Sequence, residues 1–229
     1  MTRSNAFNAG LVAMAPISAS ALPFGVMAGI AAREAGLDVA ASMGMSLVIF
    51  AGASQLAAAQ LIGDGAWAGV VVLTALIINL RFAMYSASLA PHFAYLPTRW
   101  KAPLAYLLTD QAYAVCITRF IRHPEMENRH WFYLGAALPL WVVWLTATAA
   151  GILIGAAVPP AWQLGFAVPL IFLALMVPTV HDRPMAVAAV AGGGIALLAH
   201  GMPFNLGMVT GALAGIIAGV VAERAQGAA

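Results

Sequence analysis

Apolar residues fill eight long segments of this 229-residue chain, and polar residues gather in the short connections between them. An α-helix of roughly 17–25 apolar residues can cross a membrane, whereas a membrane β-barrel needs alternation over segments of about ten. The pattern predicts an all-α polytopic membrane protein, a bundle of about eight apolar segments in a single transmembrane domain over residues 1–229. The segments are residues 9–32, 39–62, 66–90, 102–121, 131–156, 161–180, 184–200 and 203–222.

Helix-breaking residues interrupt several of these segments. The first contains Pro16 and Pro23, the sixth Pro169 and Pro178, and the seventh three consecutive glycines at 192–194. Some segments are therefore expected to be broken or re-entrant. Interruptions in corresponding places are typical of transporters built from two repeats, although the two halves show no residue-by-residue repeat.

The composition excludes a water-soluble fold. Hydrophobic residues make up 63% of the chain and charged residues 8%, whereas soluble domains carry roughly 25% charged residues. The formal net charge of +2 comes without a basic cluster, which excludes nucleic acid as a partner. The single cysteine, Cys116, excludes an internal disulfide and a cysteine-based metal site.

The sequence carries none of the motifs of nucleotide-binding or metal-dependent enzymes. Ser54 follows Gly52 as in a nucleophile elbow, but Leu56 stands where that motif needs its last glycine. We therefore expect no catalytic residue, no cofactor and no bound metal, and the chain is predicted not to be an enzyme.

If all eight segments cross the membrane, the basic residues divide unevenly between its two sides. Because Lys and Arg are enriched in cytoplasmic loops, the side with more of them is predicted to be cytoplasmic, and it holds both termini. That side carries Arg3, Arg119, Arg122, Arg129, Arg183 and Arg224, and the other side carries Arg33, Arg99 and Lys101.

Two charged residues, Arg81 and Asp110, lie at membrane depth in consecutive segments. A charge at the centre of a bilayer costs roughly 2.5–3.5 kcal/mol, so such residues face the bundle interior and find partners. Consecutive segments are usually neighbours, and we predict that Arg81 and Asp110 approach each other. At helical spacing each charge shares a stripe with hydroxyl-bearing residues: Thr74, Tyr85 and Ser88 with Arg81, and Tyr106 and Tyr113 with Asp110.

The two charges allow two interpretations. They form a structural salt bridge that fixes the register of the bundle, or they form a site in which Arg81 binds a carboxylate and Asp110 takes up a proton or an ammonium group.

The stretch FAGASQLAAAQL in the second segment is a second polar anomaly, with Gly52, Ser54 and Gln55 at its middle. Gly-Ala-Ser is a place where a helix can unwind, and irregular backbone is tolerated at membrane depth only where it lines a cavity. Freed amides at the start of a half-helix can bind a carboxylate. The alternative is tight packing of small residues, with Gln55 bonded to another helix.

Glycines at helical spacing allow two helices to approach closely. They serve either internal helix packing or a docking face for a second subunit. The pairs are Gly25 with Gly29 and Gly151 with Gly155, and a ladder runs through Gly207, Gly211, Gly215 and Gly219.

Four motifs follow in order along the chain: LPFGVMAG, FAGASQ, LIINLRFAMYSASLAPH and LTDQAYA. In sequence and spacing they closely resemble the AzlC family of branched-chain amino-acid permeases, over about residues 15–185. The resemblance implies the large subunit of a two-component secondary transporter in the bacterial cytoplasmic membrane. It also implies a small AzlD-like membrane subunit as partner, export of valine, leucine or isoleucine, and a coupling ion, either a proton or sodium.

The resemblance also marks positions in this chain: Phe50, Gly52, Ser54, Gln55, Asn79, Arg81, Thr109 and Asp110. The predicted substrate and ion pathway leaves out Phe50 and adds two tyrosines. It consists of Gly52, Ser54, Gln55, Asn79, Arg81, Tyr85, Thr109, Asp110 and Tyr113. Phe82 and Gln111 stand where family members often have histidine and glutamate. Asp110 is therefore the only carboxylate at membrane depth in this block. The alternatives to a transporter are a membrane scaffold that transports nothing and a channel for a small solute.

Overall fold

The computed structural model describes residues 1–157, 173, 177, 180–202 and 206–227. Within these residues every regular element is helical, which confirms the predicted all-α class. The sixth predicted segment, with Pro169 and Pro178, lies almost entirely outside them. The chain forms two compact units, one of residues 1–60 and 75–159 and the other of residues 61–74 and 160–229.

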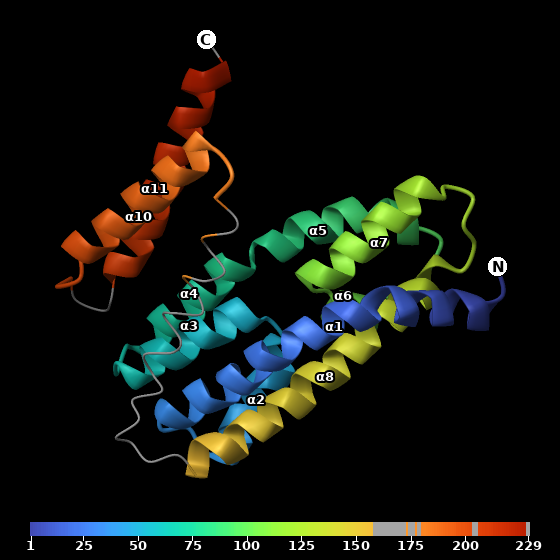
Figure 1. The fold of residues 1–229 in the computed structure, drawn as a ribbon, viewed down its shortest axis with the longest axis horizontal. Helices are drawn as coiled ribbons and strands as arrows, with labels where there is room; N and C mark the ends of the chain where they lie inside the picture. The colour runs from blue at the N-terminus through green and yellow to red at the C-terminus, as the bar shows by residue number, and fades with distance from the viewer. Residues whose placement is uncertain (158–172, 174–176, 178–179, 203–205, 228–229) are drawn as a thin grey trace. The chain divides into compact units, whose positions relative to one another are not determined.

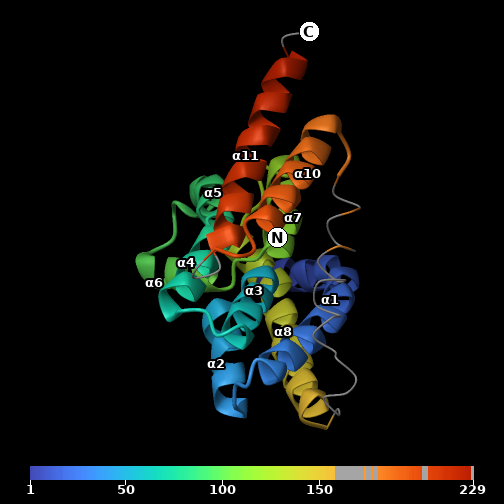
Figure 2. The same ribbon diagram turned by 90° about the vertical axis from the view of Figure 1, so that its left-hand side faces the viewer.

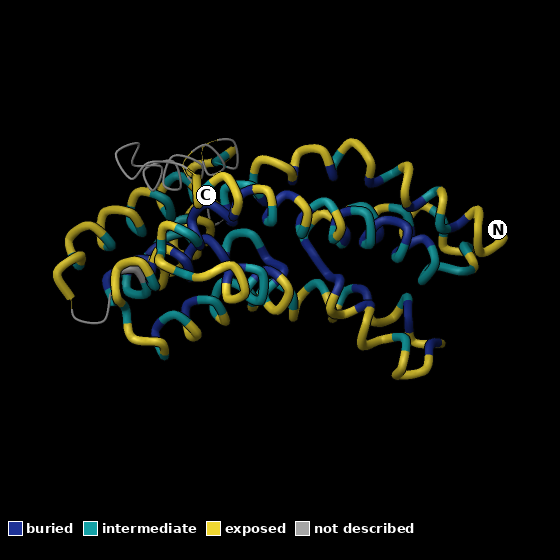
Figure 3. The backbone as a smooth tube through the Cα atoms, turned by 90° about the horizontal axis from the view of Figure 1, so that it is seen from below, coloured by how far each residue is buried: buried dark blue, intermediate teal, exposed yellow. Residues whose placement is uncertain are grey.

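Three helical stretches of the described chain are long and apolar enough to cross a membrane: Arg3–Glu34, Ala68–Phe93 and Arg129–Ala157. Exposed residues recur along the helices (Figure 3), and large apolar side chains are among them, including Val12 at 70% and Val48 at 82%. Such outward apolar side chains suit a surface that contacts lipid rather than water.

The two longest helices, α1 (Arg3–Glu34) and α8 (Arg129–Ala157), pack against each other along their length (Figure 1). Gly10 lies on Phe132 near the start of both helices, and Gly29 lies on Thr148 near their ends, so the helices run parallel. A β-carbon on Gly29 would overlap the carbonyl oxygen of Thr148. These glycines therefore allow two backbones to touch, which confirms internal packing for the Gly25–Gly29 and Gly151–Gly155 pairs.

The second predicted segment is a helical hairpin instead of one straight helix. Helix α2 (Val39–Ile49) ends at Phe50, whose φ of 23° breaks the helix, and α3 (Gly52–Gly63) begins two residues later. The amide Nε2 of Gln55 donates to Ser46 Oγ at 2.6 Å. In a continuous helix these residues would lie about 13 Å apart along the axis. The structure therefore interrupts the helix directly before Gly52, which is the first of the two alternatives that the sequence left open, and the chain reverses so that the start of α3 lies beside the end of α2.

The third predicted segment contains α4 (Ala68–Asn79), α5 (Arg81–Leu89) and the short 3₁₀-helix η1 (Ala90–Phe93). A single residue, Leu80, separates α4 from α5. Leu80 keeps helical backbone angles (φ −54°, ψ −28°), with its N–H bonded to Ile77 and its carbonyl to Ala83, so Arg81 lies inside one helical stretch that runs from Ala68 to Phe93.

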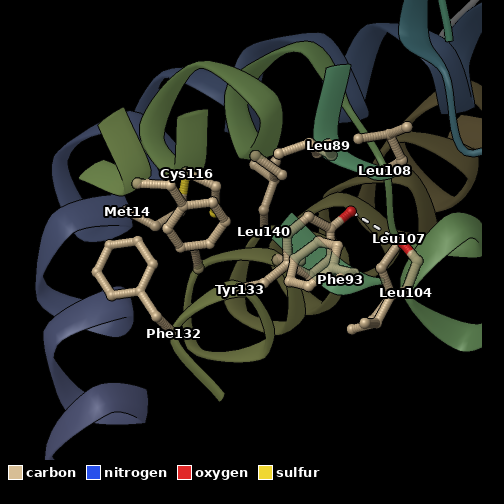
Figure 4. Close-up of a cluster of buried hydrophobic side chains, with 14 of the residues drawn as sticks. Met14, Leu89, Phe93, Leu104, Leu107, Leu108, Cys116, Phe132, Tyr133 and Leu140 are labelled. Atoms are coloured by element: carbon tan, nitrogen blue, oxygen red, sulfur yellow. Dashed lines mark hydrogen bonds between the residues drawn. The ribbon is translucent and has the colours of Figure 1, made fainter. Parts of the chain in front are cut away.

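The fourth predicted segment is a second hairpin, made of α6 (Thr98–Tyr106) and α7 (Asp110–Arg122). Trp100 of α6 packs on Trp131 near the start of α8. Phe120, near the end of α7, packs on Phe132 in the same region of α8. Both arms therefore have their outer ends beside the start of α8. The ring of Phe93 contacts Phe120 on one arm and Tyr133 of α8, so η1 lies within this cluster (Figure 4).

The hairpins correct the assumption that every apolar segment crosses the membrane. The link before α6 and the link after α7 lie at the same end of the unit, because Tyr95 hydrogen-bonds His130 and Arg129 hydrogen-bonds His92, each at 3.0 Å. The N-terminus is also there, since Asn128 donates to the carbonyl of Met1 at 2.8 Å.

The assignment of Arg99 and Lys101 to the side opposite Arg119, Arg122 and Arg129 is therefore wrong. Arg81 lies at the centre of this unit. The other basic residues are divided between its two ends much more unevenly than predicted. The N-terminal end carries Arg3, Arg99, Lys101, Arg119, Arg122 and Arg129, and the opposite end carries Arg33.

In the second unit, α10 (Arg183–Leu198) and α11 (Leu206–Gly227) lie side by side (Figure 2). Gly207 contacts Ala199 at the end of α10, whereas Gly219 contacts Ala188 near its start, so the helices are antiparallel. Asp182 caps α10 by accepting from the backbone N–H of Met185 at 2.8 Å. The glycine ladder thus packs on α10, and its predicted alternative role as a docking face is not supported.

The hairpin topology predicts which loops share a side of the membrane. Cysteines introduced at Thr98 and Glu127 should react with a membrane-impermeant maleimide from one and the same side, and a cysteine at Val39 from the opposite side. Native Cys116 is 0% exposed and should remain silent. Labelling of positions 98 and 127 from opposite sides would contradict the hairpin.

The glycine contacts predict an unequal response to one added methyl group. Gly151→Ala places a β-carbon on the carbonyl of Val26, and we expect it to lower the unfolding free energy by about 1–3 kcal/mol. Gly44→Ala, where nothing lies within 4 Å, is the matched control and should be neutral or stabilising. Thermal unfolding in detergent measures both, and equal midpoints would refute the packing argument.

Candidate functional site

The tips of the two hairpins meet beside the middle of α8. Helix α2 ends at Ile49, which frees the carbonyl of Leu47 from its bond within the helix. The hydroxyl of Tyr106, the last residue of α6, donates to this carbonyl at 2.7 Å and accepts from Trp141 Nε1 at 3.0 Å. The second hairpin thus provides the hydrogen bond that the carbonyl of Leu47 in the first hairpin lacks, and Trp141 of α8 fixes the position of the Tyr106 hydroxyl.

Arg81 and Asp110 form an ion pair beside these tips, with 2.9 Å between Arg81 Nη1 and Asp110 Oδ2. The predicted approach of the two charges is confirmed. Asp110 is the first residue of α7, after the extended residue Thr109, whereas Arg81 follows Leu80, which keeps helical backbone angles. Thr109 caps α7 by accepting from the N–H of Ala112 at 3.2 Å. The positive end of the α7 dipole favours a carboxylate at this position.

The ion pair leaves bonding capacity unused. Within the described residues, Arg81 Nε and Asp110 Oδ1 are buried atoms without a hydrogen-bond partner. The two side chains are still 30% and 38% exposed, so the pair is not sealed inside the protein. An arginine has five N–H donors and a carboxylate about four acceptor positions. The pair can therefore bind a further group that carries both a carboxylate and an ammonium.

Aromatic side chains line one flank of the pair. Tyr85 interacts electrostatically with both charges, and its ring stacks on that of Tyr113, with centroids 4.4 Å apart and planes at 13°. The hydroxyl of Tyr113 donates to Ser88 Oγ at 3.1 Å. The guanidinium of Arg81 lies over the ring of Phe82, 5.2 Å from its centroid. These contacts hold α5 and α7 together next to the charges.

The predicted helical stripes are only partly correct. Arg81, Tyr85 and Ser88 share α5, and Thr74 lies on α4, which continues into α5 through Leu80 with helical backbone angles. Tyr106 lies on α6, whereas Asp110 and Tyr113 lie on α7. A spacing rule that assumes one continuous helix cannot hold across the break between α6 and α7. Tyr106 instead joins the two hairpin tips.

A second polar group surrounds the break between α2 and α3. Gln55 donates to Ser46, and Ser46 Oγ donates to Thr148 Oγ1 of α8 at 3.3 Å, all three side chains being 0% exposed. Ser54 is equally buried and donates to the carbonyl of Ala51 at 3.1 Å. The hydroxyl of Ser54 is thus engaged in the first turn of α3.

Three further polar atoms near the breaks are buried without a hydrogen-bond partner in the part of the chain that the structure describes: Gln55 Oε1, Asn79 Oδ1 and Trp144 Nε1. Gly52 lies against the ring of Trp144, so a β-carbon there would come within 2.9 Å of it. The sequence analysis did not single out Ser46, Trp144 or Thr148. A serine, a tryptophan and a threonine inside apolar helices are too ordinary to signal a site without their partners.

The predicted residues thus form two groups. Arg81, Thr109 and Asp110 lie together with Tyr85 and Tyr113, while Gly52, Ser54 and Gln55 surround the first hairpin tip. Tyr106 and Phe50, with ring centroids 6.3 Å apart, lie where the two hairpins meet. Among the described residues no group of three His, Cys, Asp or Glu side chains is arranged to hold a metal ion.

Long apolar helices, together with helical hairpins whose tips meet beside an ion pair, define an integral membrane protein. The chain belongs to the AzlC family, whose model, described as "AzlC protein", matches residues 16–158. This membership is consistent with a role related to transport rather than with an enzyme.

Relatives with curated names are membrane proteins. An uncharacterized membrane protein of Archaeoglobus fulgidus is 32% identical over 220 residues, which is 94% of each chain. The inner membrane protein YgaZ of Escherichia coli is 25% identical over 88% of this chain and 86% of its own. An uncharacterized membrane protein of Helicobacter pylori is 30% identical over 58% of each chain. No solved structure matches the chain.

The ion pair predicts a coupled response to loss of its charges. Arg81→Gln or Asp110→Asn alone leaves one charge without its partner and should lower the unfolding free energy. The expected loss is about 1–2 kcal/mol, below the range for fully buried pairs because both side chains are partly exposed. The double variant should lose less unfolding free energy than the sum of the losses in the two single variants. Thermal unfolding of all four proteins in detergent measures the coupling, and additive losses would mean that the charges act independently.

Proposed function

We propose that this protein is the large subunit of a secondary transporter that exports branched-chain or similar small apolar amino acids. It works in the bacterial cytoplasmic membrane together with a small AzlD-like membrane subunit. The observation that supports this most is the Arg81–Asp110 pair at the start of α7, in which each charged side chain has a buried atom without a hydrogen-bond partner in the described residues.

A zwitterion complements the two charges of the pair. In this proposal the guanidinium of Arg81 binds the carboxylate of the amino acid, because an arginine presents paired N–H donors that match a carboxylate. Asp110 binds the ammonium group, or a coupling proton or sodium ion when the site holds no amino acid. Exchange between the internal pair and the bound solute keeps each charge partnered, which lowers the cost of a charge at membrane depth.

The first hairpin tip contributes polar backbone and side-chain groups in this proposal. The N–H groups at the start of α3 and the amide of Gln55 are the donors and acceptors nearest to the break. Half-helix ends play this part in other transporters, where they face anionic substrate groups or coupling ions. Asn79, at the end of α4, is assigned to the same pathway because its Oδ1 is buried and unpartnered within the described residues.

The division of basic residues supports an orientation. Because cytoplasmic loops are enriched in Lys and Arg, the end with six of them faces the cytoplasm, and the end with Arg33 faces outward. The N-terminus and the outer ends of α6 and α7 are then cytoplasmic. The second hairpin reaches from the cytoplasm towards the ion pair, and the first reaches it from the outside.

The proposal predicts that Arg81 is needed for flux and not merely for folding. In inside-out vesicles that contain both subunits, labelled valine should accumulate saturably under a proton or sodium gradient. Arg81→Ala should reduce this flux at least about tenfold, since a charge-assisted hydrogen bond contributes roughly 1.5–3 kcal/mol. Arg99→Ala, at the outer end of α6, is the matched control and should retain it.

The charge-reversed double variant Arg81→Asp with Asp110→Arg separates binding from scaffolding. It restores an ion pair and should recover thermal stability without recovering valine flux. Recovery of both would favour a purely structural pair. Absence of solute flux under every gradient, with the wild-type protein folded and both subunits present, would leave a membrane scaffold as the function.

A further inference from the structure

An apolar cavity of about 180 Å³ lies between α5 and α6. Neither Arg81 nor Asp110 lines it. Most of its walls are apolar side chains from both helices, from η1 and from α8 (Figure 4). Five of the lining residues are buried, none more than 8% exposed: Leu89, Phe93, Leu104, Leu108 and Tyr133. The hydroxyl of Tyr133 donates to the carbonyl of Leu104 at 2.9 Å, so its ring presents an apolar face. The polar side chains of the lining are Ser86 of α5, which is exposed, and Lys101 of α6.

The cavity runs between two functionally distinct places. At one end Leu108 precedes the ion-pair residue Asp110 by two positions and lies at the tip of the second hairpin. At the other end Lys101 lies near the start of α6, at the end of the unit that carries the N-terminus. Lys101 is the only lysine of the chain. The rim also contains Ala105, which is exposed and lies on the same helix as Lys101.

We propose that this cavity receives the apolar side chain of the amino acid that the ion pair binds, and that it determines which side chains are accepted. This inference rests on the proposed function and adds to it the place of side-chain selection. The size is suitable, because an apolar cavity of about 150 Å³ can hold a benzene molecule. The isobutyl side chain of leucine has fewer carbon atoms than benzene and fits in the same space.

The walls also account for what the cavity rejects. A polar or charged side chain that enters between the buried residues Leu89, Leu104 and Leu108 would lose its water without gaining a hydrogen bond from them, which costs roughly 1–3 kcal/mol on protein mutational scales. The ammonium of Lys101 at the rim attracts the carboxylate of an approaching amino acid from the cytoplasmic side. Arg81 then receives that carboxylate deeper in the protein, as the side chain moves into the cavity.

Protection from a thiol reagent tests binding independently of transport. Cysteine is introduced at Ala105, on the rim, and at Ala102, which is exposed on the same helix but does not line the cavity. Native Cys116 is fully buried and does not interfere. L-leucine should slow maleimide labelling of position 105 at least about fivefold and leave position 102 unchanged, and L-aspartate should protect neither. Protection at both positions, or at neither, overturns the inference.

Substitutions that change the volume test selection. Ala105→Leu narrows the cavity and should raise the KM for leucine at least about tenfold, as one methylene in a substrate pocket alters specificity by about 10- to 200-fold. The matched Ala102→Leu should leave that KM within a factor of two. Leu104→Ala enlarges the cavity and should increase the flux of phenylalanine relative to leucine. Unchanged KM and unchanged preference in both cavity variants overturn the inference.

The two experiments separate this inference from the proposed function. Leucine protection of position 105 without any flux retains the cavity as a binding site and rejects transport. Flux that is insensitive to Ala105→Leu, with no protection, retains transport and rejects the cavity. Labelling that changes with the acyl-chain length of the surrounding phospholipid, and not with leucine, identifies a lipid tail as the occupant and overturns the inference.

Discussion

The arrangement of this protein depends on the need to satisfy every backbone polar group at membrane depth. Water is absent there, so each place where a helix breaks must find its hydrogen bonds within the protein. The hydroxyl of Tyr106 meets this need for Leu47, and Trp141 fixes that hydroxyl in turn. Because the hydrogen-bond donor for the first hairpin tip comes from the second hairpin, the position of each tip depends on the other.

A rigid frame makes this joint possible. The glycines of α1 and α8 bring two long helices into backbone contact, and α8 supplies aromatic residues at successive depths. Trp131 meets the start of α6, Trp141 meets the tip of the second hairpin, and Trp144 meets Gly52 at the tip of the first. The same helix therefore sets the depth of both breaks, and the ion pair of Arg81 with Asp110 forms close to where they meet.

Stability and proposed function make opposite demands on this pair. A fully paired and enclosed salt bridge would hold the hairpins firmly but would have nothing left to offer a solute. Here both side chains are partly exposed, and each retains a buried atom without a partner in the described chain. Such residual capacity is what a solute with both charges can use, and an apolar cavity nearby provides space for its remaining part.

The sequence by itself determined the class of the protein and the meeting of its two charges at membrane depth. Its apolar segments required membrane helices, and the cost of a charge at membrane depth predicted that Arg81 and Asp110 meet. FAGASQ was recognised as a place where a helix can break, with tight packing of small residues as the alternative. These inferences rest on local composition and on the free-energy cost of a charge at membrane depth, and neither depends on how the helices are arranged.

Only the tertiary structure decided which segments cross and which turn back. A hairpin and a straight helix have the same apolar composition, so the sequence predicted that some of the eight segments are broken or re-entrant but did not identify residues 39–62 and 102–121 as the hairpins. The contacts that distinguish them, such as Gln55 with Ser46 and Trp100 with Trp131, join residues through space. Helical spacing also fails across a break, which is why Tyr106 serves the hairpin joint rather than the stripe of Asp110.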